Sequence, residues 1–151
     1  MRPRGGSAVR EVEFSIYKRL SQRWEELTKP LGRTELLTIW VDELDGRLNV
    51  DMFVPERLEG EGRREEALRV ALKVLQAALE EAEKEVGKVR ALSVRLHAPV
   101  CGSVPEEAGL FDASPERIRK IDPERLEKSP EEWFEKIWWH PWLLRLSKPR
   151  A

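Results

Sequence analysis

The sequence is poor in cysteine, which limits how the chain can be held together. Cys101 is the only cysteine among 151 residues, so a fold stapled by intrachain disulfides is excluded. The opening residues, MRPRGGSAVREVEF, are basic but lack a following apolar run, so we expect no secretory signal. No apolar run approaches the ~20 residues of a membrane-spanning helix. We therefore expect a cytoplasmic protein that does not enter a membrane.

The chain also lacks an excess of charge of either sign. It has 27 basic and 28 acidic side chains, for a net charge of −1. This balance gives no long-range attraction to nucleic acid or to an anionic membrane, and we expect neither as a partner. Asn and Gln are scarce while Glu, Arg and Pro are plentiful, a pattern typical of thermophile proteins. Apolar residues, at 40%, still suffice for a hydrophobic core.

Apolar side chains recur every three or four residues in two long segments, which predicts two amphipathic helices. The first begins at Ser7 and ends at the sequence KPLG of residues 29–32. Within it, the alternation over residues 9–16 leaves a strand as an alternative. The second covers residues 63–88, with Gly87 as its C-cap. Its apolar stripe contains Leu68, Leu72, Leu75, Leu79, Ala82 and Val86.

Alternating apolar residues predict three strands. Two of them flank Asp45 and Gly46, a dipeptide suited to a two-residue type I′ turn. That turn sets the expected pairs on one face as Val41 with Val50, Ile39 with Met52 and Leu37 with Val54. The third strand covers residues 88–99, and a right-handed crossover makes it parallel to the second. Residues 1–100 are therefore expected to form an α+β core domain, a two-layer α-β-β-α-β sandwich whose two long helices cover one face of a three-stranded sheet.

Residues 101–151 are expected to form a helical C-terminal segment that packs on the core or extends from it. Ser114, Asp122 and Ser129 each precede a Pro-Glu pair, which is typical of a helix N-cap followed by proline in the first turn. The last of these helices is expected to run from Ser129 to about Trp139. Pro141 then ends it, because proline has no backbone N–H to donate.

This C-terminal segment holds four of the six tryptophans of the chain within residues 133–142. On a helical wheel one side carries the residues expected to anchor the segment to the domain: Trp133, Phe134, Ile137 and Trp138. Residues off that side or beyond the proline are expected to bind a partner: Trp139, Trp142, Leu143 and Leu146. The alternative is that the whole segment only covers the second sheet face, which would carry Leu36, Trp40, Phe53 and Val89.

Three other groups of residues have chemical potential. His97, Cys101 and His140 suggest a metal site or a cysteine nucleophile, but the paired spacing of a structural zinc site is lacking. Acidic and amide side chains on the hairpin suggest a hard-cation site: Asp42, Asn49 and Asp51. Trp40 and Phe53, expected as diagonal neighbours, could stack single-stranded bases.

The leading hypothesis is a non-enzymatic regulatory or adaptor protein that binds a protein partner, or itself, through the Trp-rich C-terminal segment. Trp is enriched at interface hot spots, and a patch of this kind needs to be covered. We expect no cofactor, no metal and no catalytic residue. Two alternatives remain, a nucleic-acid-associated protein using the aromatic sheet face and a small enzyme or metal site around His97, Cys101 and His140.

Overall fold

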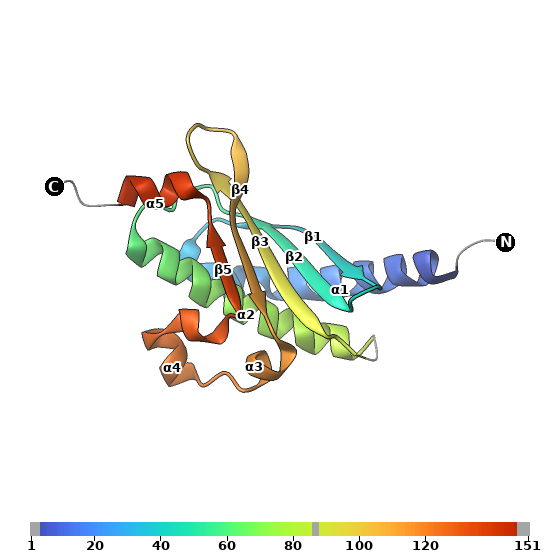
Figure 1. The fold of residues 1–151 in the computed structure, drawn as a ribbon. Coiled ribbons are helices and arrows are strands. Elements are labelled where there is room, and N and C mark those ends of the chain that lie inside the picture. The colour runs from blue at the N-terminus through green and yellow to red at the C-terminus, as the bar shows by residue number, and fades with distance from the viewer. Residues whose placement is uncertain (1–3, 86–87, 148–151) are drawn as a thin grey trace.

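The computed structural model describes residues 4–85 and 88–147, with the backbone alone for residues 4–9, 146 and 147. The chain is folded around one five-stranded sheet (Figure 1). In order, the elements are α1 (Arg4–Thr28), η1 (Lys29–Leu31), β1 (Glu35–Asp42), β2 (Arg47–Phe53), α2 (Glu61–Glu83), β3 (Ala91–Pro99), β4 (Pro105–Ala113), α3 (Pro115–Arg119), α4 (Pro123–Lys128), η2 (Pro130–Trp133), β5 (Lys136–Trp139) and α5 (Pro141–Ser147).

The strands lie in the sheet in the order in which they occur in the sequence, from β1 to β5. Neighbours are antiparallel except β2 and β3, which are parallel and joined by the crossover through α2. The expected α+β class and the parallel return of the third strand are therefore confirmed. The expected sheet of three strands is wrong, because β4 and β5 add two more.

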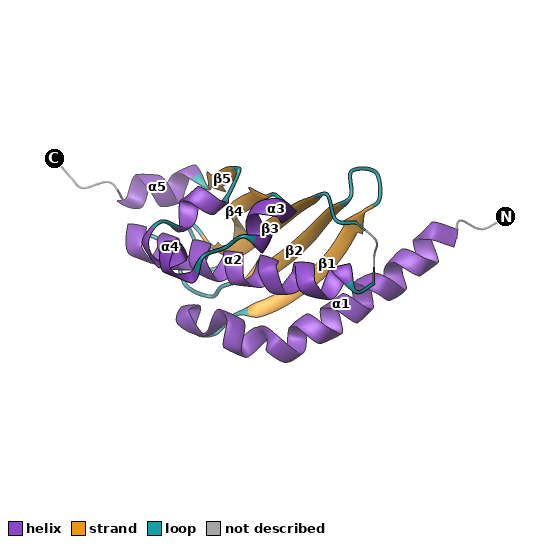
Figure 2. Cartoon of the chain, turned by 90° about the horizontal axis from the view of Figure 1, so that it is seen from below, coloured by secondary structure: helices purple, strands orange, loops and turns teal. Residues whose placement is uncertain are grey.

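Both long helices cover the same face of the sheet (Figure 2). Ile16 and Leu20 of α1 are fully buried, which confirms a helix and not a strand over residues 9–16. The expected stripe of α2 is buried at Leu68, Leu72, Leu75, Leu79 and Ala82. Val86 and the expected C-cap Gly87 lie outside the described residues. Burial of these stripes against the sheet supplies the main hydrophobic stabilisation.

The hairpin faces are as expected, but its register is shifted by two residues. The connection uses four residues, 43–46, and closes with Gly46 N donating to Asp42 O at 2.9 Å. Within this connection only Gly46 has positive φ, so the turn is not type I′. Val41 consequently pairs with Leu48 and not with Val50. A shift of two leaves every side chain on its face, because side chains alternate with a period of two.

Leu37 is the exception on this face. The β1–β2 register slips between Leu36 and Thr38, which marks a bulge, and the expected pairing of Leu37 with Val54 does not form. Leu36 is consequently buried in the core, and Leu37 is 44% exposed.

The segment after residue 100 is only partly helical. Ser114 and Asp122 cap α3 and α4 as expected, by accepting from the backbone N of Arg117 and Glu124. Ser129 makes no such bond, and the turn that follows it ends at Trp133. The expected helix through Trp139 is therefore wrong, since residues 136–139 form β5 against β4.

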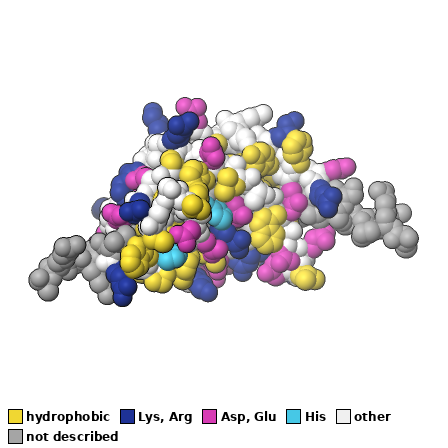
Figure 3. Space-filling model, turned by 90° about the horizontal axis from the view of Figure 1, so that it is seen from above, with side chains coloured by type: hydrophobic (Ala, Val, Ile, Leu, Met, Phe, Trp, Pro, Cys, Tyr) yellow, Lys and Arg dark blue, Asp and Glu magenta, His cyan; other side chains and the backbone are white. Residues whose placement is uncertain are grey.

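The C-terminal segment does not cover the second sheet face. The helices α3 and η2 contact α2 instead, on the side of the sheet that already carries the long helices. Trp40 stays 36% exposed, whereas Leu36 and Val89 are buried in the core. The second face of the sheet thus remains a solvent-facing surface of mixed polar and apolar side chains (Figure 3).

Candidate protein-binding surface

β5 pairs with β4 along its whole length, and two further hydrogen bonds hold its ends. Phe134 leaves η2 in an extended conformation, with φ −101° and ψ 146°. The N–H of Glu135 then donates to Asp112 O at 2.8 Å, and that of His140 donates to Ala108 O at 2.9 Å. Between these bonds, Ile137 lies opposite Phe111 and Trp139 opposite Gly109. Pairing with β4 thus overrides the local helix signals of this segment.

The strand geometry reverses the expected orientations of two neighbouring tryptophans. Successive side chains of a strand point to opposite faces. Trp139 therefore faces the helices, where its ring makes an edge contact with Phe111 at a centroid distance of 4.9 Å. Trp138 faces the open side of the sheet, opposite Leu110. The side expected to anchor the segment thus carries Trp139, and the exposed side carries Trp138.

Gly109 makes room for the aromatic packing beneath β5. A Cβ atom at this position would lie 2.7 Å from Cζ of Phe111 and 3.2 Å from Cε3 of Trp139. Phe111 is fully buried and also contacts Phe134, with ring centroids 5.6 Å apart. Three aromatic rings and a glycine therefore pack together where β5 meets the sheet, with Phe134 buried and Ile137 partly buried against the core.

Trp133 lies apart from this aromatic cluster, in the turn η2. Its ring is partly buried against the core, and the guanidinium of Arg125 lies 5.9 Å from its centroid. The recess formed by Arg117, Arg125, Glu132 and Trp133 has a volume of about 110 Å³. Pockets for small molecules usually measure about 300–1,000 Å³, so this recess does not suit one.

The last helix, α5, is fixed by His140 and Leu143. The backbone N–H of Trp142 donates to Nδ1 of His140 at 3.1 Å, so the imidazole caps the helix as an acceptor. Leu143 is fully buried and anchors α5 to the domain. Trp142 and Leu144 are 38% and 42% exposed. The side chain of Leu146 lies outside the described part of the chain.

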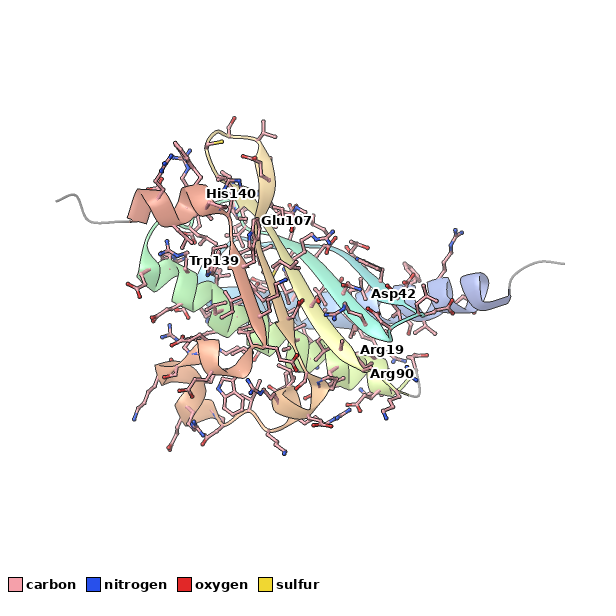
Figure 4. All side chains as sticks on the ribbon, viewed as in Figure 1. Arg19, Asp42, Arg90, Glu107, Trp139 and His140 are labelled. Carbon is pink, nitrogen blue, oxygen red and sulfur yellow. The ribbon has the colours of Figure 1, made fainter. Side chains whose placement is uncertain are left out.

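The ring of Trp138 lies 6.1 Å from that of His140, which in turn bonds the backbone of Trp142. Figure 4 shows Trp139 and His140 at the end of β5 next to α5, with Glu107 of β4 nearby. Trp138, which is partly exposed, and the exposed Trp142 and Leu144 therefore all lie at this end of β5 and in α5. We call Trp138, Trp142 and Leu144, together with the outer edge of β5, the C-terminal surface.

The outer edge of β5 has main-chain groups free to bind. β5 is the last strand of the sheet, and Figure 1 shows it at one side, with α5 at its upper end and α4 below. Within the described ranges, no side chain bonds to the backbone of residues 136–139 on this edge. Unpaired N–H and C=O groups of an edge strand can accept another strand.

The alternative enzyme or metal site is not supported by the geometry. Cys101 lies exposed in the loop between β3 and β4 and donates to Oε2 of Glu106 at 3.4 Å. That hydrogen bond and the negative charge of Glu106 raise the pKa of the thiol, which disfavours the reactive thiolate. Among the residues that the structure describes, no three His, Cys, Asp or Glu side chains could together hold a metal ion.

The hairpin residues expected to bind a cation are engaged elsewhere. Asp42 accepts from Leu44 N at 2.9 Å, and Asn49 is buried and donates to Arg47 O. Burial raises the pKa of Asp51, although the nearby charges of Arg95 and His97 act to lower it. Asp42 and Asn49 are thus engaged in hydrogen bonds within the hairpin.

The aromatic platform expected for nucleic acid does not form. Trp40 pairs with Asn49, whereas Phe53 pairs with Glu35 at the far end of the same strands. Four residues of strand separate the two positions, a distance of about 13 Å. Polar side chains instead bond to one another across the neighbouring strands. Arg47 of β2 donates to Ser93 of β3 at 2.7 Å, and Ser93 donates to Asp112 of β4 at 2.6 Å.

Sequence reasoning missed β4, β5 and the free edge that they create. A signal for β5 is the run of residues 136–139, where an aromatic pair follows Ile137, since Ile and Trp favour strands. No helix in the described part of the chain is long and apolar enough to cross a membrane. Comparisons of the chain with protein-family models, curated proteins and solved structures found no match.

Proposed function

We propose that the protein is a non-enzymatic regulatory or adaptor protein that binds another protein chain through its C-terminal surface. The observation that carries this proposal is the coincidence of exposed apolar side chains with an uncovered strand edge. Trp142 and Leu144 are exposed beside β5, whose outer main-chain groups are free within the described residues. Apolar contact and main-chain pairing together are the means by which sheet edges bind extended segments.

The binding residues in this proposal differ from those expected from the sequence. Trp142 remains, and Trp138 and Leu144 replace Trp139 and Leu143, which pack inward. Trp and other aromatic residues contribute disproportionately to binding energy when a partner excludes water from them. We also propose a cytoplasmic location, with which a chain that cannot form an intrachain disulfide is compatible.

The test compares two tryptophans of matched exposure, Trp142 in α5 beside β5 and Trp40 in β1 at the other edge of the sheet. The partner is first captured on the full-length chain from a lysate of the source organism, identified by mass spectrometry and purified. Its Kd is then measured by calorimetry. Trp142→Ala is expected to weaken binding at least about tenfold, as for an interface hot spot. Trp40→Ala, on β1, is the control and should leave Kd unchanged. Equal effects of both substitutions, or no capture and no self-association, would refute the proposal.

A further inference from the structure

We infer that the protein binding to the C-terminal surface is a second copy of this chain, with β5 of each copy paired antiparallel to β5 of the other. The inference rests on the proposed function and names its partner. Three features support it: the direction of the main-chain groups, the side chains that the pairing would align, and the charges at the two ends of β5.

The main-chain groups that face outward belong to Ile137 and Trp139. The N–H of His140 points inward, to Ala108 O. Backbone groups alternate in direction along an antiparallel strand, so those of Trp138 also point to β4. Ile137 and Trp139 then present their N–H and C=O groups to the free edge. Neither has a side-chain cap in the described part of the molecule.

One register uses all of these groups. If Ile137 of each copy lies opposite Trp139 of the other, the two pairs exchange four N–H···O bonds around a two-fold axis at Trp138. Ile137 and Trp139, both half-buried in one copy, would then cover each other on the helix side of the sheet. The two Trp138 rings would meet on the open side. An isologous dimer with a continuous sheet results.

Charged side chains of opposite sign flank the two ends of β5, acidic before the strand and basic after it. Before the strand, Glu131 and Glu135 are exposed and form no ion pair with any described residue. After it, Arg145 is exposed and lies over its own Trp142, 5.7 Å from the ring centroid. Antiparallel pairing brings the end of one copy that carries Glu131 and Glu135, followed by the exposed Lys136, to the same side of the dimer as the end of the other copy that carries Arg145, twice per dimer. A foreign strand would have no built-in reason to match both ends, so the charge pattern favours a second copy.

The opposite edge of the sheet does not offer the same possibility. Glu13 of α1 accepts from Val41 N at 2.6 Å, and Tyr17 of α1 donates to Leu36 O at 3.1 Å. These contacts occupy outward main-chain groups of β1 and so discourage pairing there. A dimer through β5 therefore remains closed and does not grow into a longer chain of copies.

The first test is the mass in solution and its response to charge reversal. Sedimentation equilibrium of the full chain is expected to give twice the monomer mass of 17.6 kDa. Glu131→Lys combined with Glu135→Lys should give monomers, and so should Arg145→Glu. An equal mixture of these two variants should restore a dimer, because one acidic–basic contact set is regained with reversed sign. Glu43→Lys, in the hairpin loop, is the control and should stay dimeric.

The second test checks the register by disulfide trapping in a chain that carries Cys101→Ser. Trp138→Cys should form an interchain disulfide on mild oxidation, since the two positions face each other across the two-fold axis as a close pair. Lys136→Cys is the control on the same strand, because its copy would lie about 13 Å away, beyond disulfide reach. Rapid linking at position 138 alone supports the inference, whereas linking at both positions or at neither overturns it.

The two proposals fail in different ways. A chain that stays monomeric, or a dimer unaffected by the charge reversals, overturns pairing through β5. If such a chain still loses a different partner on Trp142→Ala, the proposed function stands and the occupant is a strand of that partner. Absence of both self-association and any partner removes the proposed function as well.

Discussion

The two edges of the sheet end in different ways, although both belong to the same layer. At β1, side chains of α1 bond to outward main-chain groups. At β5, the sheet ends in a four-residue strand with half-exposed apolar side chains and no comparable caps from the described residues. An unpaired edge strand promotes aggregation unless it is short, covered by other groups, or paired with a partner. The difference indicates that β1 is protected against association, whereas β5 is available for it.

The largest effect is expected where β5 is attached to the sheet. Phe111→Ala should lower the free energy of unfolding by about 3–5 kcal/mol, because it removes a fully buried ring that contacts both Phe134 and Trp139. Urea denaturation at low protein concentration measures the change. Leu110→Ala, on the open face of the same strand, should lose about 1 kcal/mol or less. Equal losses would show that β5 does not depend on the aromatic cluster.

The two sides of β5 should respond differently to loss of a ring. Trp139→Ala should destabilise the monomer by about 2–4 kcal/mol, since the ring packs against Phe111. Trp138→Ala should change monomer stability by less than about 1 kcal/mol, because its ring faces the open side. Thermal melts and urea titrations of both variants in dilute solution make the comparison. A larger loss at Trp138 would mean that β5 is turned the other way.

A single substitution in α1 should expose a main-chain N–H group of the edge strand β1. Glu13→Ala should lower the free energy of unfolding by about 1–2 kcal/mol, because the N–H of Val41 loses its acceptor. Hydrogen exchange of that amide should accelerate, and association should become concentration-dependent. Glu13→Gln keeps an oxygen acceptor and serves as the control. If both variants behave like the parent chain, the helix contact does not protect β1.

The smallest effect concerns the open face between the two edges. Burial raises the pKa of Asp51 above its ordinary value of 3.8. A raised pKa in the folded state means that the protonated form contributes stability, which is full below pH 3.8 and lost as the pH rises through the folded pKa.

Asp51→Asn should therefore be as stable as the parent chain at low pH and more stable at pH 7. The difference should stay below about 1 kcal/mol, since water reaches part of the carboxylate. Urea titrations from pH 3 to pH 8 test this pH dependence. A stability gain that is largest at low pH would contradict it.

The sequence predicted the parts of the fold in which local pattern and tertiary environment agree. Both long helices, the hairpin and β3 have clear periodicity, because each buries one face against the same core. The hairpin register was missed because Asp45-Gly46 sits at the end of a four-residue loop. Turn length is decided by how the two strands pack, and the dipeptide alone does not determine it.

The candidate surface was predicted in composition but not in orientation. Local signals around Ser129 favour a helix, and only pairing with β4 makes residues 136–139 a strand. β4 itself was missed because Gly109 and two of its three acidic residues, Glu106 and Glu107, interrupt its apolar alternation, whereas Gly109 is needed beneath the ring of Trp139. Changing a helix to a strand exchanges the roles of Trp138 and Trp139. That aromatic side chains of this segment pack on the core could be predicted, but not which ring faces outward.

The position of β5 as the last strand also has a consequence during protein synthesis. Strands β1 to β4 are complete at residue 113, but β5 is not complete until residue 139. At translation rates of about 5–20 residues per second, β4 waits on the order of one to five seconds for its partner. During this interval Phe111 lacks its contacts with Phe134 and Trp139 on the nascent chain. Each nascent chain therefore passes through a stage in which β4 is the unpaired edge of the sheet.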